Sequence, residues 1–525
     1  MMVLRNLFFK IIFLIFAFAI STNVNASIDE RNSTYVCPEW FGALGDGKHD
    51  DTEAFVKASA ISSRLKLQDG KVYVLSTKCS DNGRNCAVVI KRDFHVEGNN
   101  ATIRIADDTR NLFSVFLPEL SKFDINVSFT DLRVDFNAEH NQDVRLNNVK
   151  DRRYLFRCDM IKNFTATKCH FIYNGTNALL VRRADSILID SCRFEWNSFR
   201  NFDNSSVTVG TKAKGKGIVT NCLFAPIGYK EGHLPTYYMF GGVEVQGIGR
   251  IDVVNNTFMG IEKAINISDI SCTKGIDWDY DDIVPMTGAK NIERNSFTDC
   301  RTSIAFWSYA NAVDHVRIKN NTCIIGNVWY DEIGNSSKRK YPQFVSTEAA
   351  KNFLQQDKYA YYGKLGRIVI DSNIIVNRTD WKSYWNRYKY SDKNRGCIEL
   401  LSLKMDHCSI LNNTISDMPG CIFMYGLRYP SSSFPTSVIL DIVNNNVQNC
   451  VGVSIHESYP NARSKQSVFV YLRNDDEKSK IIVDGNRITD SSVGLPIQWF
   501  DNSQGVKEIV TDNNIFQKLY LPSNY

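Results

Sequence analysis

Residues 253–258 read Val-Val-Asn-Asn-Thr-Phe, residues 292–297 read Ile-Glu-Arg-Asn-Ser-Phe, and residues 318–323 read Ile-Lys-Asn-Asn-Thr-Cys. Each stretch has an apolar residue first, Asn fourth and an apolar residue sixth. The pattern occurs eleven times with Asn or Cys fourth, at residues 166–171, 189–194, 219–224, 253–258, 292–297, 318–323, 370–375, 410–415, 442–447, 483–488 and 510–515. Successive fourth positions are 23 to 52 residues apart. This spacing is typical of a solenoid with fixed strands and loops of different length.

The apolar residues of each stretch alternate with polar ones, and this period of two predicts a strand that ends in a turn. A second alternating stretch precedes most of them, at residues 178–182, 242–246, 264–268, 303–307, 397–401, 421–425, 452–456 and 494–498. Patterns typical of helices are nearly absent between these strands. Short strands at a fixed period predict a parallel β-helix, in which equivalent side chains of successive coils stack.

The residues in the fourth position predict a ladder inside this solenoid. Stacked Asn side chains can hydrogen-bond along the axis and satisfy the backbone of the turns. Cys169, Cys192 and Cys222 share the column, and Cys300 and Cys450 lie just after their repeats. We interpret most of the 14 cysteines as small buried apolar residues, because stacked side chains seldom reach disulfide geometry.

Cys79 and Cys86 differ from the other cysteines, because they flank the turn-rich residues 80–85. In an exported protein this spacing favours a local disulfide bridge. No CxxC pair and no His/Cys cluster with the spacing of zinc ligands occurs in the sequence. A structural zinc site is therefore not expected.

The first 26 residues have the pattern of a secretory signal peptide. Arg5 and Lys10 flank an apolar stretch at residues 11–20, and residues 24–26, Val-Asn-Ala, offer a cleavage site. An uncleaved anchor is the alternative, but the apolar stretch is short for a bilayer. Cleavage near Ala26 predicts a secreted or periplasmic protein with no later membrane span. Losing Arg5 and Lys10 lowers the formal charge from +5 to +3, so the global charge indicates little about partners.

Residues 39–52 read Glu-Trp-Phe-Gly-Ala-Leu-Gly-Asp-Gly-Lys-His-Asp-Asp-Thr, and a short amphipathic helix follows. Asp50 and Glu53 have the spacing of a capping box. The apolar face of the helix comprises Ala54, Phe55, Ala58 and Ile61. Such a helix would close the open end of the solenoid.

This opening resembles the FGAxGDGxxDDT motif of the pectate-lyase-like superfamily of right-handed β-helices, and the repeats extend the resemblance over almost the whole mature chain. Members include rhamnogalacturonan- and polygalacturonan-degrading enzymes, related lyases and phage tailspike depolymerases. The resemblance implies a secreted or surface protein that acts on polysaccharide. It does not imply one reaction, because the signatures of the polygalacturonases are missing. Asp46, Asp50 and Asp51 are interpreted as part of the structural cap rather than as a metal or catalytic cluster.

The outward residues of the second strand in each coil are expected to stack into a surface column. In any soluble β-protein such residues are polar, but exposed aromatics among them favour a binding surface for sugar rings. Coils rise by about 4.8 Å each, so the column can lie along several sugar units. Its predicted members are Arg182, Glu244, Gln246, Asn266, Ser268, Trp307, Glu399, Phe423, Tyr425, Ser454, His456 and Gln498.

Glycoside hydrolysis requires two carboxyl groups, and Glu244 with one acid of residues 277–282 is the best pair in the sequence. This segment carries Asp277, Asp279 and Asp281 beside two aromatic residues. A solvated acidic loop is the ordinary alternative. The protein requires no cofactor on this interpretation, and calcium at these acids is the one metal left open.

Residues 377–396 form a second loop, with Trp381 and Trp385 among six basic and two acidic residues, a formal charge of +4. Basic and aromatic side chains suit an anionic glycan, although a loop packed on the solenoid is an equal alternative. Nucleic acid fits the same charges, but export argues against it. His456 and Glu457 offer an acid and a base for a lyase, yet a lone exposed histidine is commonly inert.

The composition, 43% apolar with 12 Pro and 30 Gly, excludes a disordered or collagen-like chain. We predict a single-stranded right-handed parallel β-helix of PbH1-type repeats with a short capping helix. Residues 1–26 form the signal peptide, 27–165 the cap and first coils, and 166–525 the repeats, within one continuous domain, 27–525. The leading hypothesis is cleavage of an acidic polysaccharide, by hydrolysis or elimination. The alternative is a glycan-binding surface protein without activity. Related β-helices also raise the expectation of a homotrimer.

Overall fold

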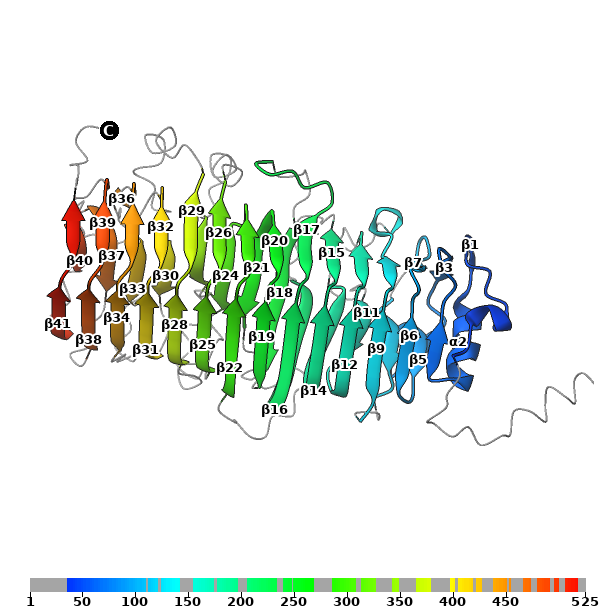
Figure 1. Cartoon of the computed structure of the whole chain (residues 1–525). Helices are drawn as coiled ribbons and strands as arrows, with labels where there is room; N and C mark the ends of the chain where they lie inside the picture. The colour runs from blue at the N-terminus through cyan, green and yellow to red at the C-terminus, as the bar shows by residue number, and fades with distance from the viewer. Residues whose placement is uncertain are drawn as a thin grey trace, which may run out of the picture.

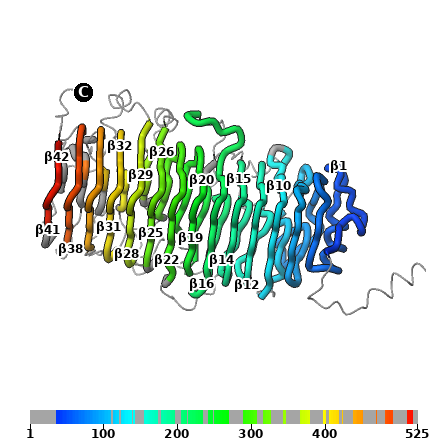
Figure 2. Tube along the Cα trace, viewed as in Figure 1, coloured from blue at the N-terminus to red at the C-terminus, as the bar shows by residue number. Residues whose placement is uncertain are grey.

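The structure is a computed structural model of the 525-residue chain. It describes residues 35–109, 112–120, 124–141, 154–173, 177–196, 205–233, 239–247, 249–268, 286–307, 313–326, 342–348, 365–378, 397–401, 405–418, 422–426, 438–450, 453–454, 466–473, 479–491, 495–499 and 506–517. Its strands wind into a right-handed parallel β-helix, which confirms the predicted fold (Figure 1). The trace shows coil after coil stacked along one axis (Figure 2).

The strands form one 15-stranded and one 27-stranded sheet. The smaller one, which we call the short-strand sheet, comprises β1 (Asp46–Asp50), β3 (Val72–Leu75), β7 (Thr102–Ile105), β10 (Arg133–Asp135), β13 (His170–Ile172), β15 (Arg193–Trp196), β17 (Leu223–Pro226), β20 (Thr257–Met259), β23 (Ser296–Thr298), β26 (Thr322–Ile325), β29 (Ile374–Asn377), β32 (Thr414–Ser416), β35 (Asn446–Gln448), β39 (Arg487–Thr489) and β42 (Ile515–Gln517).

The larger sheet contains two series of parallel strands. The first series comprises β2 (Arg64–Lys66), β6 (Phe94–Glu97), β9 (Asn126–Thr130), β12 (Ile161–Thr167), β14 (Leu179–Asp190), β16 (Ser205–Thr220), β19 (Arg250–Val254), β22 (Met286–Glu293), β25 (Val313–Lys319), β28 (Leu365–Asp371), β31 (Met405–Leu411), β34 (Ile439–Val443), β38 (Ser479–Asp484) and β41 (Val506–Asp512).

The second series, which we call the site face, includes the first halves of the long strands β14 and β16. Its other strands are β5 (Arg84–Ile90), β8 (Ser114–Pro118), β11 (Tyr154–Cys158), β18 (Met239–Gly247), β21 (Ile261–Ile267), β24 (Thr302–Trp307), β27 (Gln343–Glu348), β30 (Ile398–Leu401), β33 (Phe423–Gly426), β37 (Gln466–Arg473) and β40 (Leu495–Trp499). Two short strands, β4 (Cys79–Asp81) and β36 (Val453–Ser454), pair antiparallel with β5 and β37.

The core is a set of side-chain columns that run along the axis. In the sixth repeat position, five phenylalanine rings stack with centroids 4.7–5.2 Å apart: Phe171, Phe194, Phe224, Phe258 and Phe297. Each of these side chains is fully buried. The ring spacing is that of neighbouring strands, so identical residues stack because the coils repeat.

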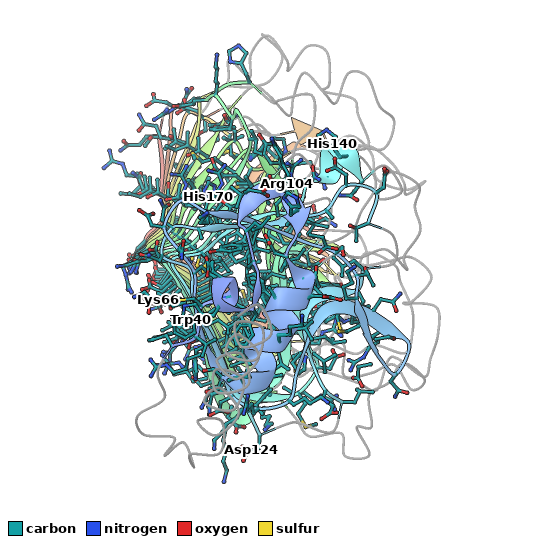
Figure 3. All side chains as sticks on the ribbon, turned by 90° about the vertical axis from the view of Figure 1, so that its right-hand side faces the viewer. Trp40, Lys66, Arg104, Asp124, His140 and His170 are labelled. Carbon is teal, nitrogen blue, oxygen red and sulfur yellow. The ribbon has the colours of Figure 1, made fainter. Side chains whose placement is uncertain are left out.

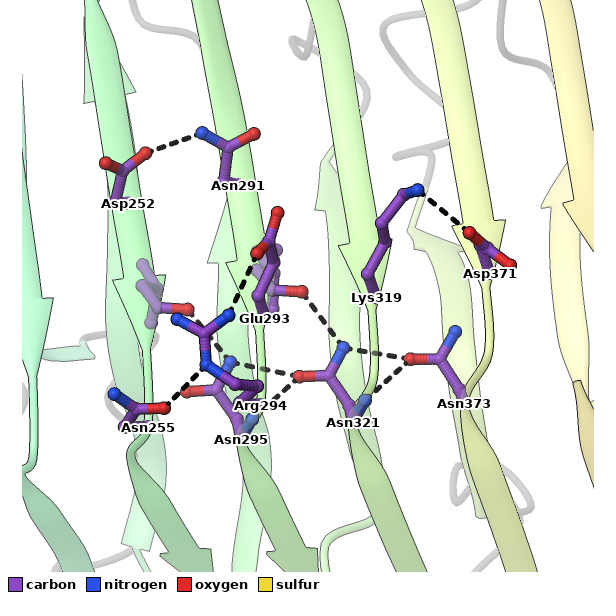
Figure 4. Close-up of polar contacts among 12 residues, drawn as sticks. Asp252, Asn255, Asn291, Glu293, Arg294, Asn295, Lys319, Asn321, Asp371 and Asn373 are labelled. Carbon is purple, nitrogen blue, oxygen red and sulfur yellow. Dashed lines mark hydrogen bonds and ion pairs between the residues drawn. The ribbon is translucent and has the colours of Figure 1, made fainter.

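The predicted asparagine ladder is present. Asn295, Asn321 and Asn373 each donate from Nδ2 to Oδ1 of the next Asn at 2.9–3.1 Å, and their backbone amides bond the same oxygen. Figure 4 shows the bonds from Asn295 to Asn321 and from Asn321 to Asn373. The ladder ends at Asn514, which accepts two bonds from Asn486. Placing Asn513 in the last position was therefore wrong by one residue. Asn513 instead has a left-handed φ of 49°, like the residue before most other ladder positions.

The cysteine interpretation is confirmed for the ladder. Cys169, Cys192 and Cys222 are buried free thiols in the same column, and Cys222 continues it by donating its amide to Asn256 Oδ1 at 2.9 Å. Cys79 and Cys86 are also reduced in this structure, and they lie opposite each other on β4 and β5.

A helix closes the N-terminal end, as expected. Viewed from that end, α2 (Thr52–Ile61) lies across the coil, close to Trp40 of the 3-10 helix η3 (Pro38–Phe41) (Figure 3). A second short 3-10 helix, η4 (Ala138–His140), follows β10. Phe55 packs edge-on against Tyr73 in the core, whereas Ile61 is 46% exposed, so its assignment to the buried face was wrong. In the described ranges no helix has the length and apolarity that a bilayer span requires.

The acids of the opening motif are structural, as interpreted. Asp51 is buried and accepts from the amides of Leu44 at 2.7 Å and Gly45 at 3.2 Å. Asp50 accepts from the amide of Thr52 at 3.0 Å. The expected capping box between Asp50 and Glu53 is absent, because the helix begins one residue later, after Asp51.

Candidate functional site

Residues of the site face stack in register from coil to coil. In register with Glu244, at the same height of each successive strand, are Thr208 on one side and, on the other, Asn266, Ala305, Ser346, Glu399, Met424, Tyr471 and Gln498. We call this set the site column. The backbones of Glu244, Asn266, Glu399 and Gln498 are therefore in register along one column.

Two expected members of the column, Phe423 and Ser454, were misplaced, and Tyr425 is described by its backbone alone. Phe423 is 1% exposed and pairs with the core residue Ile398, so its expected outward position was wrong. The backbone of Tyr425 is in register with Leu400, and its side chain lies outside the described parts. Ser454 lies on β36, which pairs antiparallel with β37, so β37 supplies the stacked strand and Tyr471 its column residue.

Glu244 is held by side chains from three successive coils. Gln246 Nε2 donates to Glu244 Oε1 at 2.7 Å, and Ser268 Oγ donates to the same oxygen at 2.6 Å. Thr208 Oγ1 donates to Oε2 at 3.2 Å and accepts from Asn177 Nδ2 at 2.9 Å. The carboxylate is thus fixed in position, and it remains partly exposed. A fixed and accessible carboxylate can accept hydroxyl groups or take part in proton transfer.

The surroundings of Glu244 have more acceptors than donors. Within the described parts of the chain, the side-chain oxygens of Asn177, Gln246 and Asn266 make no hydrogen bond, although all three residues are at least nine-tenths buried. A buried amide oxygen without a donor is costly, by about 1–3 kcal/mol each. The cluster is therefore suited to a ligand or to water that brings hydroxyl donors.

Arg182 supplies the positive charge of the site. It lies on β14, its Nη1 is 3.5 Å from Asp159 Oδ1, and its side chain is 16% exposed. Burial lowers the pKa of the Arg182 guanidinium, while the carboxylates of Asp159 and Glu244 oppose that shift. Arg182 is thus paired with Asp159 and is a candidate partner for an anionic sugar.

Glu399 lies on the column but not on the surface. Its side chain is fully buried, and Gln343 Nε2 donates to its Oε2 at 2.9 Å. Ser346, its register partner, is also fully buried, and its Oγ has no hydrogen bond to any residue that the structure describes. Because the Glu399 carboxylate is buried and hydrogen-bonded, it is less accessible to a sugar than the Glu244 carboxylate.

The other predicted site residues are not placed by side chain. The backbone of Trp307 pairs with Glu348 at the end of β24, but its side chain lies outside the described parts. The remaining predicted residues also lie outside the described ranges: Asp277, Asp279, Asp281, Trp381, Trp385 and His456. Among the residues that are described, no three His, Cys, Asp or Glu side chains gather as metal ligands.

Thr208, Asn177 and Asp159 contribute to the site, and the sequence analysis missed them. Thr208 stands between Val207 and Val209, and this alternation was a usable signal for an outward position on a strand. Asn177 precedes β14, and Asp159 follows β11. Residues just beyond strand ends carry no periodicity, so only the stacking of the coils reveals them.

No protein-family model and no curated protein matches the sequence. Among solved structures, a mutant tailspike protein of the E. coli bacteriophage HK620, in complex with a pentasaccharide, matches with a TM-score of 0.54 and 14% identity over 93% of this chain and 79% of that chain. Tailspike protein 3 of bacteriophage CBA120 matches with a TM-score of 0.50 and 12% identity over 91% of this chain and 61% of that chain. Gene product 12 of bacteriophage phi29 matches with a TM-score of 0.50 and 13% identity over 94% of this chain and 58% of that chain. At these identities the likeness concerns the fold.

Proposed function

We propose that this chain is a β-helix of the pectate-lyase-like superfamily that binds polysaccharide along the site column, with Glu244 at the centre of the site. The observation that carries the proposal is that three buried amide oxygens around Glu244, those of Asn177, Gln246 and Asn266, have no donor among the described residues. Sugar hydroxyls are donors of the required kind. The similar HK620 tailspike holds a pentasaccharide on the same fold, and this supports a carbohydrate as the ligand.

The polysaccharide is proposed to be acidic. The Glu244 carboxylate acts electrostatically on the Arg182 guanidinium, which lies 3.5 Å from Asp159, and a guanidinium can bind a carboxylate through two parallel hydrogen bonds. The predicted basic loop at residues 377–396 would add to this preference. Its first residue, Asn377, ends β29, and Arg378 Nη1 lies 2.5 Å from Glu231 Oε1, whereas residues 379–396 lie outside the described ranges.

Cleavage of the bound chain is the second candidate function, and the fixation of Glu244 favours it. Three hydrogen bonds hold the carboxylate in one orientation while it stays partly exposed. Hydrolysis would need a second carboxyl group about 5–9.5 Å away, and Asp277, Asp279 and Asp281 are the proposed source. Elimination by a lyase would need a base instead.

One experiment separates binding from cleavage. Purified residues 27–525 are incubated overnight with a panel of acidic and neutral polysaccharides and analysed by size-exclusion chromatography with ultraviolet detection. Co-elution with an acidic polysaccharide supports the proposed binding. Shortened chains add cleavage, and an ultraviolet signal from unsaturated ends distinguishes elimination from hydrolysis. Absence of both co-elution and shortening across the panel contradicts the proposal.

Export and trimeric assembly are further parts of the proposal. Secretion of the full-length chain with loss of residues 1–26, read by N-terminal sequencing, tests the signal peptide. Analytical ultracentrifugation of residues 27–525 tests the trimer, and a mass of one chain would reject it.

A further inference from the structure

The hairpin of β4 and β5 places two cysteines directly opposite each other. The strands pair antiparallel, with Cys79 against Cys86, Ser80 against Asn85, and Asp81 against Arg84. The turn residues Asn82 and Gly83 both have a left-handed φ, of 52° and 77°, as a two-residue hairpin turn of type I′ requires.

An ion pair at the end of the hairpin supports this register. Arg84 Nη2 lies 2.5 Å from Asp81 Oδ2, and both side chains are mostly buried. With the turn fixed on one side and β5 paired with β8 on the other, Cys79 and Cys86 cannot slip past each other.

This spacing is compatible with a covalent bond. Residues that face each other on antiparallel strands have Cα atoms about 4.5–5.5 Å apart. Disulfides span Cα distances of about 4.4–6.8 Å. The strands would therefore need no large movement to accept a bridge.

The pair Cys79 and Cys86 differs from the thiols of the ladder in its exposure to solvent. Cys169, Cys192 and Cys222 are at most 2% exposed, so an oxidant cannot reach them in the folded protein. Cys79 is partly exposed, while Cys86 lies buried behind it. The pair thus has one thiol for the oxidant to meet and a second one beside it.

We propose that Cys79 and Cys86 are a redox site that closes to a disulfide when the protein meets a disulfide oxidant. The Cys79 thiolate attacks one sulfur of the oxidant and forms a mixed disulfide with it, and the other sulfur of the oxidant leaves as a thiol. The Cys86 thiolate then attacks Cys79 Sγ, forms the Cys79–Cys86 bond and releases the second thiol. Two electrons and two protons pass from the pair to the oxidant, so the step is balanced. The bond locks β5, the first strand of the site face.

The pH dependence of the reaction follows from the burial of the thiols. Burial raises the pKa of Cys79, and burial together with Cys79 and Asp81 raises the pKa of Cys86 to about 12. Few thiolates are present at neutral pH, so closure is expected to be slow there and faster at pH 9 than at pH 7.

Peptide mapping tests the proposal. Residues 27–525 are incubated with glutathione disulfide at pH 8.5, the remaining thiols are alkylated, and the unreduced digest is analysed by mass spectrometry. The expected product is a peptide pair linked through Cys79 and Cys86, two hydrogen masses lighter than the thiols. Recovery of both cysteines alkylated, or of a persistent glutathione adduct on Cys79, overturns the proposal.

Two controls keep this result specific. Cys86→Ser is expected to retain glutathione on Cys79, because no second thiol resolves the adduct. Cys37 is also partly exposed and serves as an internal reference. A bridge from Cys37 to Cys79 in place of the Cys79–Cys86 bond would contradict the proposed pairing.

Discussion

Ser268 Oγ donates a hydrogen bond of 2.6 Å to Glu244 Oε1 from the coil that follows. Thr208 reaches the other carboxylate oxygen from the coil that precedes. Neither contact joins neighbours in sequence, so the site exists only where three coils are stacked in register. The arrangement makes Glu244 the centre of the described site and Ser268 and Thr208 the residues that position it.

Removing the hydroxyl of Ser268 should weaken polysaccharide binding without unfolding the protein. Ser268→Ala deletes a hydrogen bond to a carboxylate, and a loss of about tenfold in affinity is expected. Isothermal titration calorimetry with the polysaccharide found by co-elution measures the change. Ser296→Ala, on the short-strand sheet, is the matched control and should bind normally. Equal affinities for the two variants would remove Ser268 from the site.

Arg182 should determine the preference for acidic chains. Arg182→Lys keeps the charge but loses the planar fork that pairs with a carboxylate, so binding of an acidic polysaccharide should fall by about tenfold. Arg193→Lys, on β15, is the control. Affinity for acidic and neutral polysaccharides is compared by the same titration. A loss of equal size for both would argue against pairing between Arg182 and a sugar carboxylate.

The asparagine ladder should dominate stability in the middle of the solenoid. Asn373 accepts two bonds from Asn321 and donates to Asn413 and to Ile318 O, at 2.9–3.0 Å, and it is fully buried. Asn373→Ala should lower the free energy of unfolding by about 2–4 kcal/mol, because several buried groups lose their partners. Denaturant unfolding measures it. The exposed Asn446→Ala should cost under about 0.5 kcal/mol, and a similar cost for both would show that the ladder contributes little.

A buried carboxylate anchors the loop that follows β17. Asp299 accepts from Tyr229 Oη at 2.7 Å and from the Gly232 amide at 2.8 Å. A Cβ at Gly326 would lie 2.0 Å from Asp299 Oδ1. Gly326→Ala should therefore displace Asp299 and speed tryptic cleavage after the exposed Lys230.

Gly210→Ala is the control for this experiment, because a Cβ there meets only ordinary contacts. Its rate of cleavage after Lys230 should equal that of the unmodified protein. If Gly326→Ala also leaves the rate unchanged, Asp299 does not hold the loop.

Asp371 should stabilise the protein at neutral pH but not in acid. Burial raises the pKa of its carboxyl group, but hydrogen bonds from Lys319, Asn412 and Ser372 outweigh this and lower the pKa below 3.8 (Figure 4). A lowered pKa in the folded state gives stability above the unfolded value and loses it as pH falls through the folded value. Asp371→Asn should cost about 1 kcal/mol at pH 7 and less at pH 3.

Denaturant unfolding at both pH values checks this, with Asp124→Asn as the control because the Asp124 side chain is 85% exposed. An effect of Asp371→Asn that grows toward pH 3 would contradict the assigned sign.

The fold was predictable because stacking requires one residue type to recur at one position. Asn321 and Asn373 are 52 residues apart, yet their amides bond each other, and the sequence records this as a repeat. The repeat could not be traced before residue 166, because Ala101 and Leu132 take the ladder position in the first coils. These residues pack in the core, but they lack the side-chain amide whose recurrence makes the repeat recognisable in the sequence.

The site was less predictable, because alternation along a strand does not determine which of the two alternate sets of residues faces outward. Phe423, Met424 and Tyr425 are all large and apolar or aromatic, so local pattern could not reveal that Phe423 is buried. Nor could it reveal that β37, rather than the strand at Val453, continues the stack. Register between coils decides both, and register depends on loop lengths that carry no local signal.

The central claim is that Glu244 contacts the polysaccharide. It is tested most directly by calorimetric titration of the unmodified protein, of Glu244→Gln and of Glu293→Gln with the same acidic polysaccharide. Glu293 lies on β22, in the other series of strands, so the two variants carry the same chemical change at different surfaces. The account predicts that Glu244→Gln loses at least about tenfold in affinity while its circular dichroism and the binding of Glu293→Gln stay unchanged. Unchanged binding by a folded Glu244→Gln would contradict it.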